Sequence, residues 1–282
     1  MKFVKMNGAG NDFIILDNRD GRYAFEDLSR IAQVVCHRHL SIGADGMMAV
    51  EKADGDADFK MVFINSDGSL GEMCGNGARC ICRYAYEFGL SGETQRVETT
   101  AGLVTGVRID KINYRIRLND PSILVPDYPV ELEGVTYPCA YVELGNPGLP
   151  HGVLELKNLA EKDFEELRPL GRALRYHPAF PKGVNMNFYE IIEPDHLVEK
   201  TFERGVEDFT YACGTGTGSV VSVLWTKGLV SGKNVLVDVP GGRLIIDIVG
   251  EKGKIKDLYL TGPTNIVCVG ELTDEMLDAS LL

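Results

Sequence analysis

A short turn of cysteine and glycine occurs twice in this chain of 282 residues, each time directly before a segment rich in apolar and small residues. The first turn, CGNG, begins at Cys74, and the second, CGTG, begins at Cys213, 139 positions later. Gly89 and Gly228, which follow the two segments, are separated by the same 139 positions. A single period that covers half of the chain predicts two similar domains rather than a solenoid of many short repeats.

Each half also contains strand-like and helix-like segments in a similar mixture. Runs rich in β-branched and aromatic residues predict strands at 3–6, 12–17 and 59–65 in the first half and at 184–192, 234–239 and 243–249 in the second. Two further segments, 26–40 and 162–174, are predicted to be helices, the first from its amphipathic periodicity. Both halves are therefore expected to mix strands with helices.

The segments that follow the two cysteines differ from these amphipathic helices. Residues 217–229 are small or apolar almost all round, which suits a helix enclosed by its sheet rather than one lying on it. The glycines before each segment let the backbone turn sharply, and Gly89 and Gly228 stand where a helix would stop. The sequence thus predicts a mixed α/β (α+β) fold of two pseudo-symmetric domains. Each domain would be a barrel of strands wrapped around one central buried helix, with a cysteine at the helix N-terminus.

The bulk composition limits the class of partner. A formal net charge of −12 argues against nucleic acid or an anionic membrane, both of which require a basic face. No run approaches the ~18 apolar residues of a membrane span, and the first residues do not resemble a secretory leader. Seven cysteines in such a chain indicate reduced thiols rather than a disulfide framework. We expect a cytoplasmic protein that binds a small molecule and neither nucleic acid nor membrane.

A cysteine at a helix N-terminus suits proton transfer. The free backbone N–H groups and the helix dipole favour negative charge there, so they lower the pKa of a thiol from ~8.5 toward neutrality and can also hold a carboxylate. Two such turns that face one another across a cleft would place a thiolate and a thiol on opposite sides of one carbon. The first would remove a proton and the second would return one from the far face, which inverts a stereocentre without a cofactor.

Other interpretations of these residues are less favourable. The remaining cysteines are expected to be small buried hydrophobic residues; they are Cys36, Cys80, Cys82, Cys139 and Cys268. The spacing Cys-x5-Cys-x-Cys lacks the paired CxxC or the spaced histidines of a zinc site. A phosphate or dinucleotide loop is disfavoured because neither copy completes GxGxxG or carries a Walker lysine. No metal or cofactor is therefore expected.

The motifs KMNGAGNDFIILD, GADG, NSDGSLGEMCGNGARC, ETTAG, GNP, GVNMNF, FERG, ACGTG and GPT follow one another in this order. In this respect the chain resembles the diaminopimelate epimerase family over nearly its whole length. The resemblance implies a diaminopimelate epimerase-like fold with one domain of residues 1–117 plus a returning strand at 265–282, a second domain of residues 118–264, and a catalytic cleft between them. It also implies cofactor-independent interconversion of LL- and meso-diaminopimelate, a step toward lysine and peptidoglycan, and a homodimer.

The resemblance assigns roles to individual residues. Cys74 and Cys213 would be the two acid–base residues. Backbone N–H groups of four residues would hold the reacting carboxylate, namely Gly75, Asn76, Gly214 and Thr215. Asn65, Asn185 and Arg204 would grip the distal amino-acid end of the substrate. Glu203 and His151 would orient the reacting end, and Asn11 and Asn146 would line the pocket.

Some positions depart from the family pattern and leave alternatives open. In GNPGLPH, three residues separate the Gly-Asn-Pro motif from His151, whereas the family usually has the histidine directly after it. Gly218 is a second departure. One alternative is therefore a racemase of another amino acid on the same fold. Another is a binding or redox-sensing protein in which Cys74 and Cys213 form a reversible disulfide.

Overall fold

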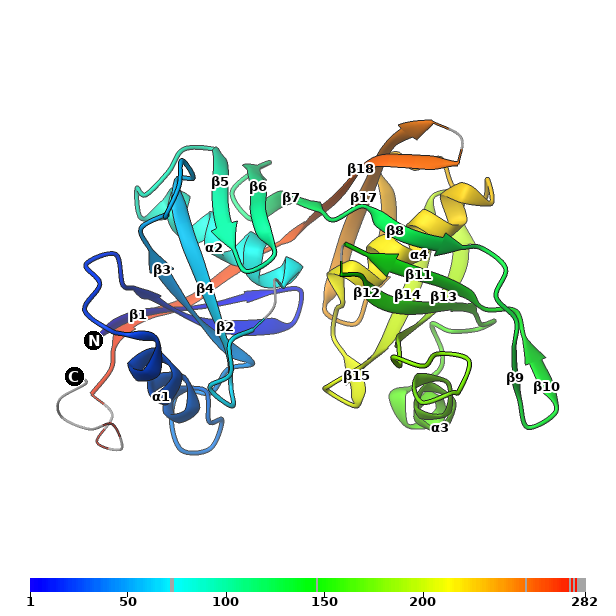
Figure 1. The fold of residues 1–282 in the computed structure, drawn as a ribbon, viewed down its shortest axis with the longest axis horizontal. Helices are drawn as coiled ribbons and strands as arrows, with labels where there is room; N and C mark the ends of the chain where they lie inside the picture. Colours follow the sequence, from blue (N-terminus) through cyan, green and yellow to red (C-terminus); the bar gives the residue numbers. More distant parts are fainter. Residues whose placement is uncertain (72–73, 146, 252, 274, 276, 278–282) are drawn as a thin grey trace. The chain divides into compact units, whose positions relative to one another are not determined.

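The structure is a computed structural model that describes residues 1–71, 74–145, 147–251, 253–273, 275 and 277 (Figure 1). The chain divides into two compact units. Unit 1 consists of Met1–Ile116 and Gly262–Leu282, and unit 2 consists of Arg117–Thr261. The chain thus leaves unit 1 within β7 (Asn113–Leu118) and returns within β18 (Lys254–Pro263). No helix in the described ranges is long and apolar enough to cross a membrane.

Unit 1 surrounds helix α2 (Gly75–Glu87) with strands and carries helix α1 (Phe25–Val35). Its strands are β1 (Lys2–Gly8), β2 (Asn11–Asp17), β3 (Gly46–Glu51), β4 (Phe59–Asn65), β5 (Thr94–Thr99), β6 (Gly102–Arg108) and β19 (Asn265–Glu271). The pairs β2–β3 and β4–β5 are parallel, whereas β1–β2, β3–β4 and β5–β6 are antiparallel. The C-terminal strand β19 pairs with β1 and so completes the sheet of unit 1.

Unit 2 repeats this arrangement around helix α4 (Gly214–Thr226), with helix α3 (Phe164–Arg175) in the place of α1. Its strands are β8 (Pro121–Val125), β11 (Ala140–Leu144), β12 (Leu149–Glu155), β13 (Asn185–Glu193), β14 (His196–Glu203), β15 (Asp208–Thr210), β16 (Val235–Val239) and β17 (Gly242–Glu251). The short strands β9 (Val130–Leu132) and β10 (Val135–Tyr137) form a separate hairpin.

The sheet pairings of unit 1 recur in unit 2, which adds β15 beside β14 and the hairpin of β9 and β10. The parallel pairs β12–β13 and β14–β16 match β2–β3 and β4–β5, and β8 pairs with β11 as β19 pairs with β1. The duplication seen in the sequence is therefore a duplication of topology, and the predicted mixed fold with one buried helix per domain is confirmed.

The helices α2 and α4 also end in the same way. Gly89 and Gly228 adopt φ values of 69° and 72°, in the left-handed region that glycine enters without strain. The N–H group of Leu90 bonds to the carbonyl of Ala85, and that of Leu229 bonds to Leu224. These bonds define a Schellman motif at the end of each buried helix, which fixes its length.

One predicted element is too long. The helix expected at 26–40 ends at Val35, because the carbonyl groups of Val35 and Cys36 accept hydrogen bonds from Gly43 and Ala44 instead of continuing the helix. The buried face of α1 consists of Leu28, Ile31, Ala32 and Val35, so the apolar pattern that predicted this helix also ends at Val35.

Candidate active site

The two cysteines occupy the same position in the two units. Cys74 is the N-cap of α2 and Cys213 is the N-cap of α4, and both have an extended backbone conformation. The carbonyl of Cys74 accepts from the N–H of Ala78 at 2.8 Å, and that of Cys213 accepts from Thr217 at 2.9 Å. Cys74 is half-buried, whereas Cys213 is only 9% exposed. Each thiol therefore lies where the N-terminal N–H groups of a buried helix converge.

The fourth residue of each turn is glycine, and the atoms nearest to it differ between the two units. A Cβ atom added to Gly216 would lie 2.1 Å from Asn187 Oδ1, whereas one added to Gly77 would lie 3.3 Å from Met48 Sδ. Met48 on β3 and Asn187 on β13 occupy corresponding places in the two sheets. The strand beneath the Cys213 turn thus presents an amide where the strand beneath the Cys74 turn presents a thioether.

The predicted residues around Cys74 are linked by hydrogen bonds. Asn76 is 1% exposed, and its Nδ2 donates to Asn11 Oδ1. Asn76 Oδ1 accepts from the guanidinium of Arg79 at 2.9 Å, and the same guanidinium lies 3.4 Å from the carbonyl of Gly75. Arg79 is completely buried, so a positive charge is held within the first turns of α2. A positive charge there favours an anion at Cys74.

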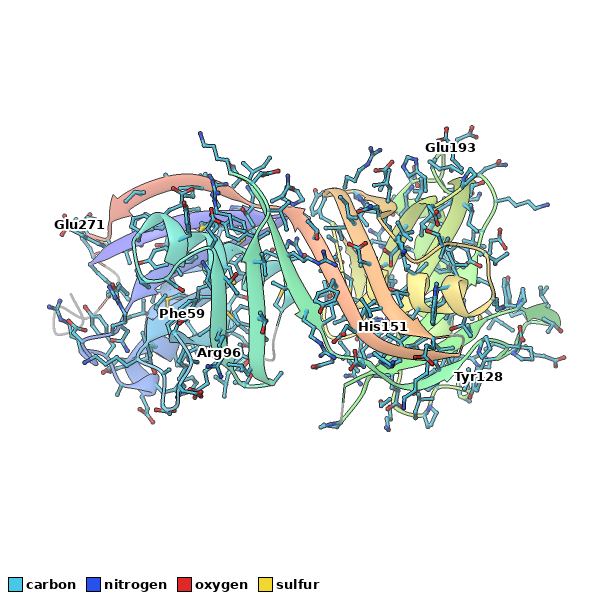
Figure 2. The ribbon with its side chains drawn as sticks, turned by 90° about the horizontal axis from the view of Figure 1, so that it is seen from above. Phe59, Arg96, Tyr128, His151, Glu193 and Glu271 are labelled. Atoms are coloured by element: carbon cyan, nitrogen blue, oxygen red, sulfur yellow. The ribbon has the colours of Figure 1, made fainter. Side chains whose placement is uncertain are left out.

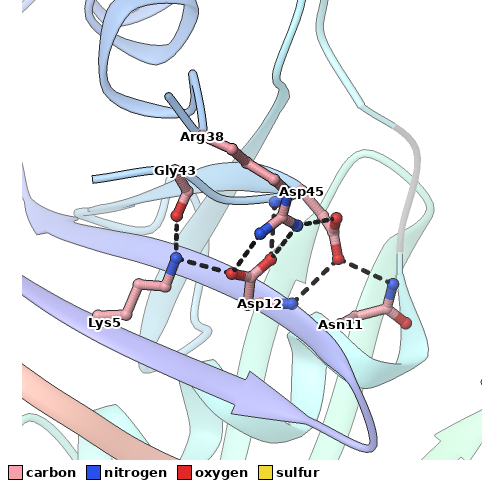
Figure 3. A network of polar contacts seen from close by, with 6 residues as sticks. All are labelled: Lys5, Asn11, Asp12, Arg38, Gly43 and Asp45. Carbon is pink, nitrogen blue, oxygen red and sulfur yellow. Dashed lines mark hydrogen bonds and ion pairs between the residues drawn. The ribbon is translucent and has the colours of Figure 1, made fainter. Parts of the chain in front are cut away.

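Asn11 is held in turn by an ion-pair network on β2 (Figure 3). Its Nδ2 donates to Asp45 Oδ2 at 3.2 Å, and Asp45 Oδ1 pairs with Arg38 at 2.6 Å. Arg38 also pairs with Asp12 at 2.7 Å, and Lys5 pairs with the same carboxylate at 2.7 Å. Partial burial raises the pKa of Asp12, but hydrogen bonds from Arg38 and Lys5 outweigh it and bring that pKa below its usual value. The network therefore orients Asn11 toward Asn76.

Asn65 lies at the end of β4 and closes the turn that follows. Its backbone N–H donates to the carbonyl of Ser69, its Nδ2 donates to Ser69 Oγ at 2.9 Å, and its carbonyl accepts from Gly68. The described contacts of Asn65 are thus those of a turn residue.

In unit 2, three of the predicted residues lie where β13 begins and β14 ends. Asn185 Oδ1 accepts from the backbone N–H of Arg204 at 2.8 Å, which ties the two residues together. The guanidinium of Arg204 donates to the carbonyl of Lys182 at 3.1 Å. Glu203 Oε1 accepts from Thr210 Oγ1 at 2.6 Å. The structure therefore brings Asn185, Glu203 and Arg204 into one group.

His151 lies on β12, next to Asn185 in the parallel register, and is labelled in Figure 2. It is completely buried; burial, followed by the charge of Arg204, lowers its pKa to about 3, so the ring is neutral. Its Nδ1 lies 3.3 Å from Asn187 Nδ2, which also donates to the carbonyl groups of Gly152 and Asn185. Nε2 has no hydrogen-bond partner among the described residues. Asn146, the other predicted residue near this motif, lies outside the described residues.

Cys213 has an electrostatic environment unlike that of Cys74. Burial, followed by the negative charge of Glu203, holds the pKa of Cys213 well above its usual value. The hydroxyl of Thr215, 3.6 Å from Sγ, and the N–H of Gly216 act in the opposite direction. Without a ligand, Cys213 is therefore a neutral thiol at neutral pH.

A set of buried polar residues beneath the Cys213 turn was not predicted from the sequence. They are Asn187 on β13, Glu199 and Thr201 on β14, and Thr217 on α4. Glu199 and Thr201 follow Leu197 on the buried face of β14 at intervals of two residues. That alternation, read from Leu197, is the signal that could have placed both side chains inside.

The fold of the chain is shared with solved structures of low sequence identity. The putative phenazine biosynthesis protein from Clostridium difficile aligns with a TM-score of 0.68 and 12% identity, covering 96% of this chain and 99% of its own. The probable proline racemase from Agrobacterium radiobacter aligns with a TM-score of 0.67 and 17% identity, covering 99% of this chain and 95% of its own. The hydroxyproline epimerase from Agrobacterium vitis aligns with a TM-score of 0.66 and 17% identity, covering 96% of this chain and 90% of its own. The chain thus shares its fold with these proteins.

Sequence comparison identifies the family within that fold. The sequence model described as diaminopimelate epimerase matches residues 3–119 and 144–267. The diaminopimelate epimerase of Aquifex aeolicus is 36% identical over 290 residues, which cover 99% of this chain and 100% of the relative. That of Methanothrix thermoacetophila is 38% identical over 285 residues, covering 98% of both. The chain belongs to the diaminopimelate epimerase family and is an isomerase, as the resemblance predicted.

Proposed function

We propose that this chain converts LL-2,6-diaminopimelate to meso-diaminopimelate without a cofactor, by transferring protons between the substrate and two cysteines, in the pathway to lysine and peptidoglycan. The observation that carries the proposal is the repeated site: two buried helices in one chain, each capped by a cysteine and preceded by an extended backbone. The names of the family and of its full-length relatives support the choice of substrate.

In the proposed reaction, the thiolate of one cysteine removes the α-proton, and the thiol of the other donates its proton to the opposite face of the same carbon. The two thiols exchange protonation states, and the configuration at that carbon is inverted. Negative charge develops on the α-carboxylate as the C–H bond breaks. Backbone N–H groups of Gly75 and Asn76 on α2 and of Gly214 and Thr215 on α4 would stabilise this charge.

The remaining residues would recognise a substrate with two ammonium and two carboxylate groups. Arg204 suits the distal carboxylate because its planar guanidinium binds bidentately, and Asn185, already bonded to the Arg204 backbone, would stand beside it. Asn65 would complete the distal subsite. Glu203 offers a carboxylate to an ammonium group, and the unpaired Nε2 of His151 offers a buried polar nitrogen to the substrate. A shorter amino acid would leave such groups unpaired, which is the proposed source of selectivity.

Two further proposals accompany this mechanism. Thiols that exchange protons must stay reduced, which fits a cytoplasmic location. The homodimer that the family resemblance implies is testable by measuring the mass of the protein in solution.

The test is proton NMR of LL-diaminopimelate in heavy water with the reduced protein and a panel of other L-amino acids. We expect the α-proton signal to disappear and the meso isomer to form only from the diamino diacid. Faster exchange from another amino acid would replace the substrate assignment with that of a racemase. Cys74→Ser and Cys213→Ser should each abolish epimerisation. A variant that retains near-normal turnover would exclude its cysteine from the mechanism.

A further inference from the structure

The carboxyl group of Glu199 lies directly beneath the first turn of α4. Glu199 is 1% exposed, and its Oε2 is 2.5 Å from Thr217 Oγ1. Thr217 Oγ1 is also 3.1 Å from the carbonyl oxygen of Cys213. On its other side, Glu199 Oε1 is 3.3 Å from Thr201 Oγ1, which lies 3.0 Å from Asn187 Oδ1. A continuous chain of polar contacts thus joins Glu199 to the residue proposed as an acid–base group.

The groups in contact with the carboxyl group of Glu199 are buried and uncharged. Thr217 Oγ1 donates to Glu199 Oε2 at 2.5 Å, and Thr201 Oγ1 lies 3.3 Å from Oε1. The carbonyl of Cys213 also accepts the backbone N–H of Thr217, so the turn is bonded through both the backbone and the hydroxyl group. Among the described residues no cation pairs with Glu199. A carboxyl group buried against neutral hydroxyl groups favours its protonated form.

The fold does not require this polar chain, because unit 1 is built without it. In the duplicated topology, Glu199 lies opposite Tyr189 and Thr201 opposite Asn187 as Met61 lies opposite Val50 and Phe63 opposite Met48, and Thr217 corresponds to Ala78. Met61 and Ala78 are buried apolar residues. The polar chain is therefore confined to the helix that carries Cys213, which indicates a role tied to that cysteine rather than to the stability of the architecture.

We propose that Glu199 is a positioning residue for Cys213: as a neutral acid it fixes the first turn of α4 through Thr217, and it keeps a negative charge away from the thiol. This inference rests on the proposed function, in which Cys213 must exist for part of each cycle as a thiolate. A carboxylate in the same place would oppose that thiolate, whereas the neutral acid does not. Glu199 thus permits thiolate formation at Cys213 only while it retains its proton.

The surroundings of Glu199 are consistent with a neutral acid at neutral pH. Burial raises the pKa of Glu199 to about 8, and the nearby charge of Glu203 acts in the same direction. The other titratable groups near it are Tyr189, opposite Glu199 on β13, and Cys213 itself. Lys200 and Asp238 line a neighbouring cavity of unit 2 together with Glu199. The carboxyl group would therefore ionise just above neutral pH.

The test measures the reactivity of Cys213 and does not depend on turnover. The full chain and its Glu199→Gln variant would be alkylated with iodoacetamide at several pH values, and the rate at Cys213 would be followed by peptide mass spectrometry. Exposed Cys268 is the internal control. We expect rates that agree within about twofold at pH 7, and a rate about tenfold higher in the variant at pH 9, where only the wild type carries the extra charge.

Each outcome of this experiment is informative. A difference of the same size at every pH would mean that Glu199 only packs, and no difference at any pH would mean that it does not act on Cys213; either result overturns the proposal. The double variant Glu199→Met/Thr217→Ala removes both partners and so leaves neither side chain as an unpaired buried polar group. At pH 9 its alkylation rate at Cys213 should therefore also lack the slowing expected in the wild type. The unmodified protein should show an infrared band of a protonated carboxyl group at pH 7 that is lost at high pH; its absence at pH 7 overturns the proposal. Failure of the epimerisation assay alone would contradict the proposed function and leave these results intact.

Discussion

The two cysteines have the same backbone position but opposite charges near them. Arg79 is buried one turn below Cys74, and among the described residues no carboxylate pairs with its guanidinium. Its counterpart in the duplicated sequence is Gly218, which has no side chain. Cys213 instead lies within the field of Glu203. For the proposed mechanism, this asymmetry predicts that Cys74 ionises more readily than Cys213.

Replacement of Arg79 should test this asymmetry. In Arg79→Met we expect the alkylation rate of Cys74 at pH 7 to fall about tenfold, because a thiolate there would lose the attraction of a buried positive charge. The rate at Cys213 should change by less than about twofold. Arg79→Lys, which keeps the charge, should restore part of the rate at Cys74. Equal rates at Cys74 in the wild type and in Arg79→Met would refute the assignment.

At the scale of the helix, the glycine of each turn is constrained by the strand beneath it. A Cβ on Gly216 would approach Asn187 Oδ1 to 2.1 Å, and Asn187 is held by hydrogen bonds to Gly152, Asn185 and Thr201. The Met48 Sδ below Gly77 belongs to a flexible side chain and lies 3.3 Å away. The glycine of the motif therefore packs on a fixed amide, Asn187, in unit 2 and on a flexible thioether, Met48, in unit 1.

The matched variants Gly216→Ala and Gly77→Ala should behave differently. We expect Gly216→Ala to lower the free energy of unfolding by about 1–3 kcal/mol, because the new methyl group must displace a hydrogen-bonded amide. Gly77→Ala should change it by less than about 1 kcal/mol, since alanine also favours the helix. Chemical denaturation followed by circular dichroism measures both. Equal losses for the two variants would show that the support beneath Gly216 adjusts as readily as that beneath Gly77.

The elements also show what the sequence could and could not predict. The two buried helices were predictable because cysteine and glycine mark their starts and glycine marks their ends, and because the segment that forms α4 is small or apolar almost all round. The end of α1 was not, because the residues after Val35 resemble helix formers and only long-range hydrogen bonds from Gly43 and Ala44 stop it. Glu199 and Thr201 were missed because charged residues that alternate along a strand usually face solvent, and only the packing of α4 shows that this face is inside.

At the scale of the whole molecule, two buried groups set opposing trends in stability. His151 has a pKa of about 3 in the folded chain against 6.5 for a free side chain, so the unfolded chain binds more protons between these values and stability falls as pH drops below 6.5. Glu199 has a pKa of about 8 against 4.5, so the folded chain binds more protons between these values and stability falls as pH rises above 4.5. Between pH 4.5 and 6.5 the two slopes cancel, and above 6.5 only that of Glu199 remains.

Wild-type protein should therefore lose stability between pH 6.5 and 8, by at most about 1.4 kcal/mol per pH unit from Glu199. Glu199→Gln should not show this loss of stability, because an amide does not titrate. The exposed control Glu161→Gln should lose stability as the wild type does. Scanning calorimetry across this range measures the melting temperature of each variant. If wild type and Glu199→Gln decline in parallel from pH 6.5 to 8, Glu199 is already ionised in the folded chain, and the proton assigned to it beneath Cys213 is wrong.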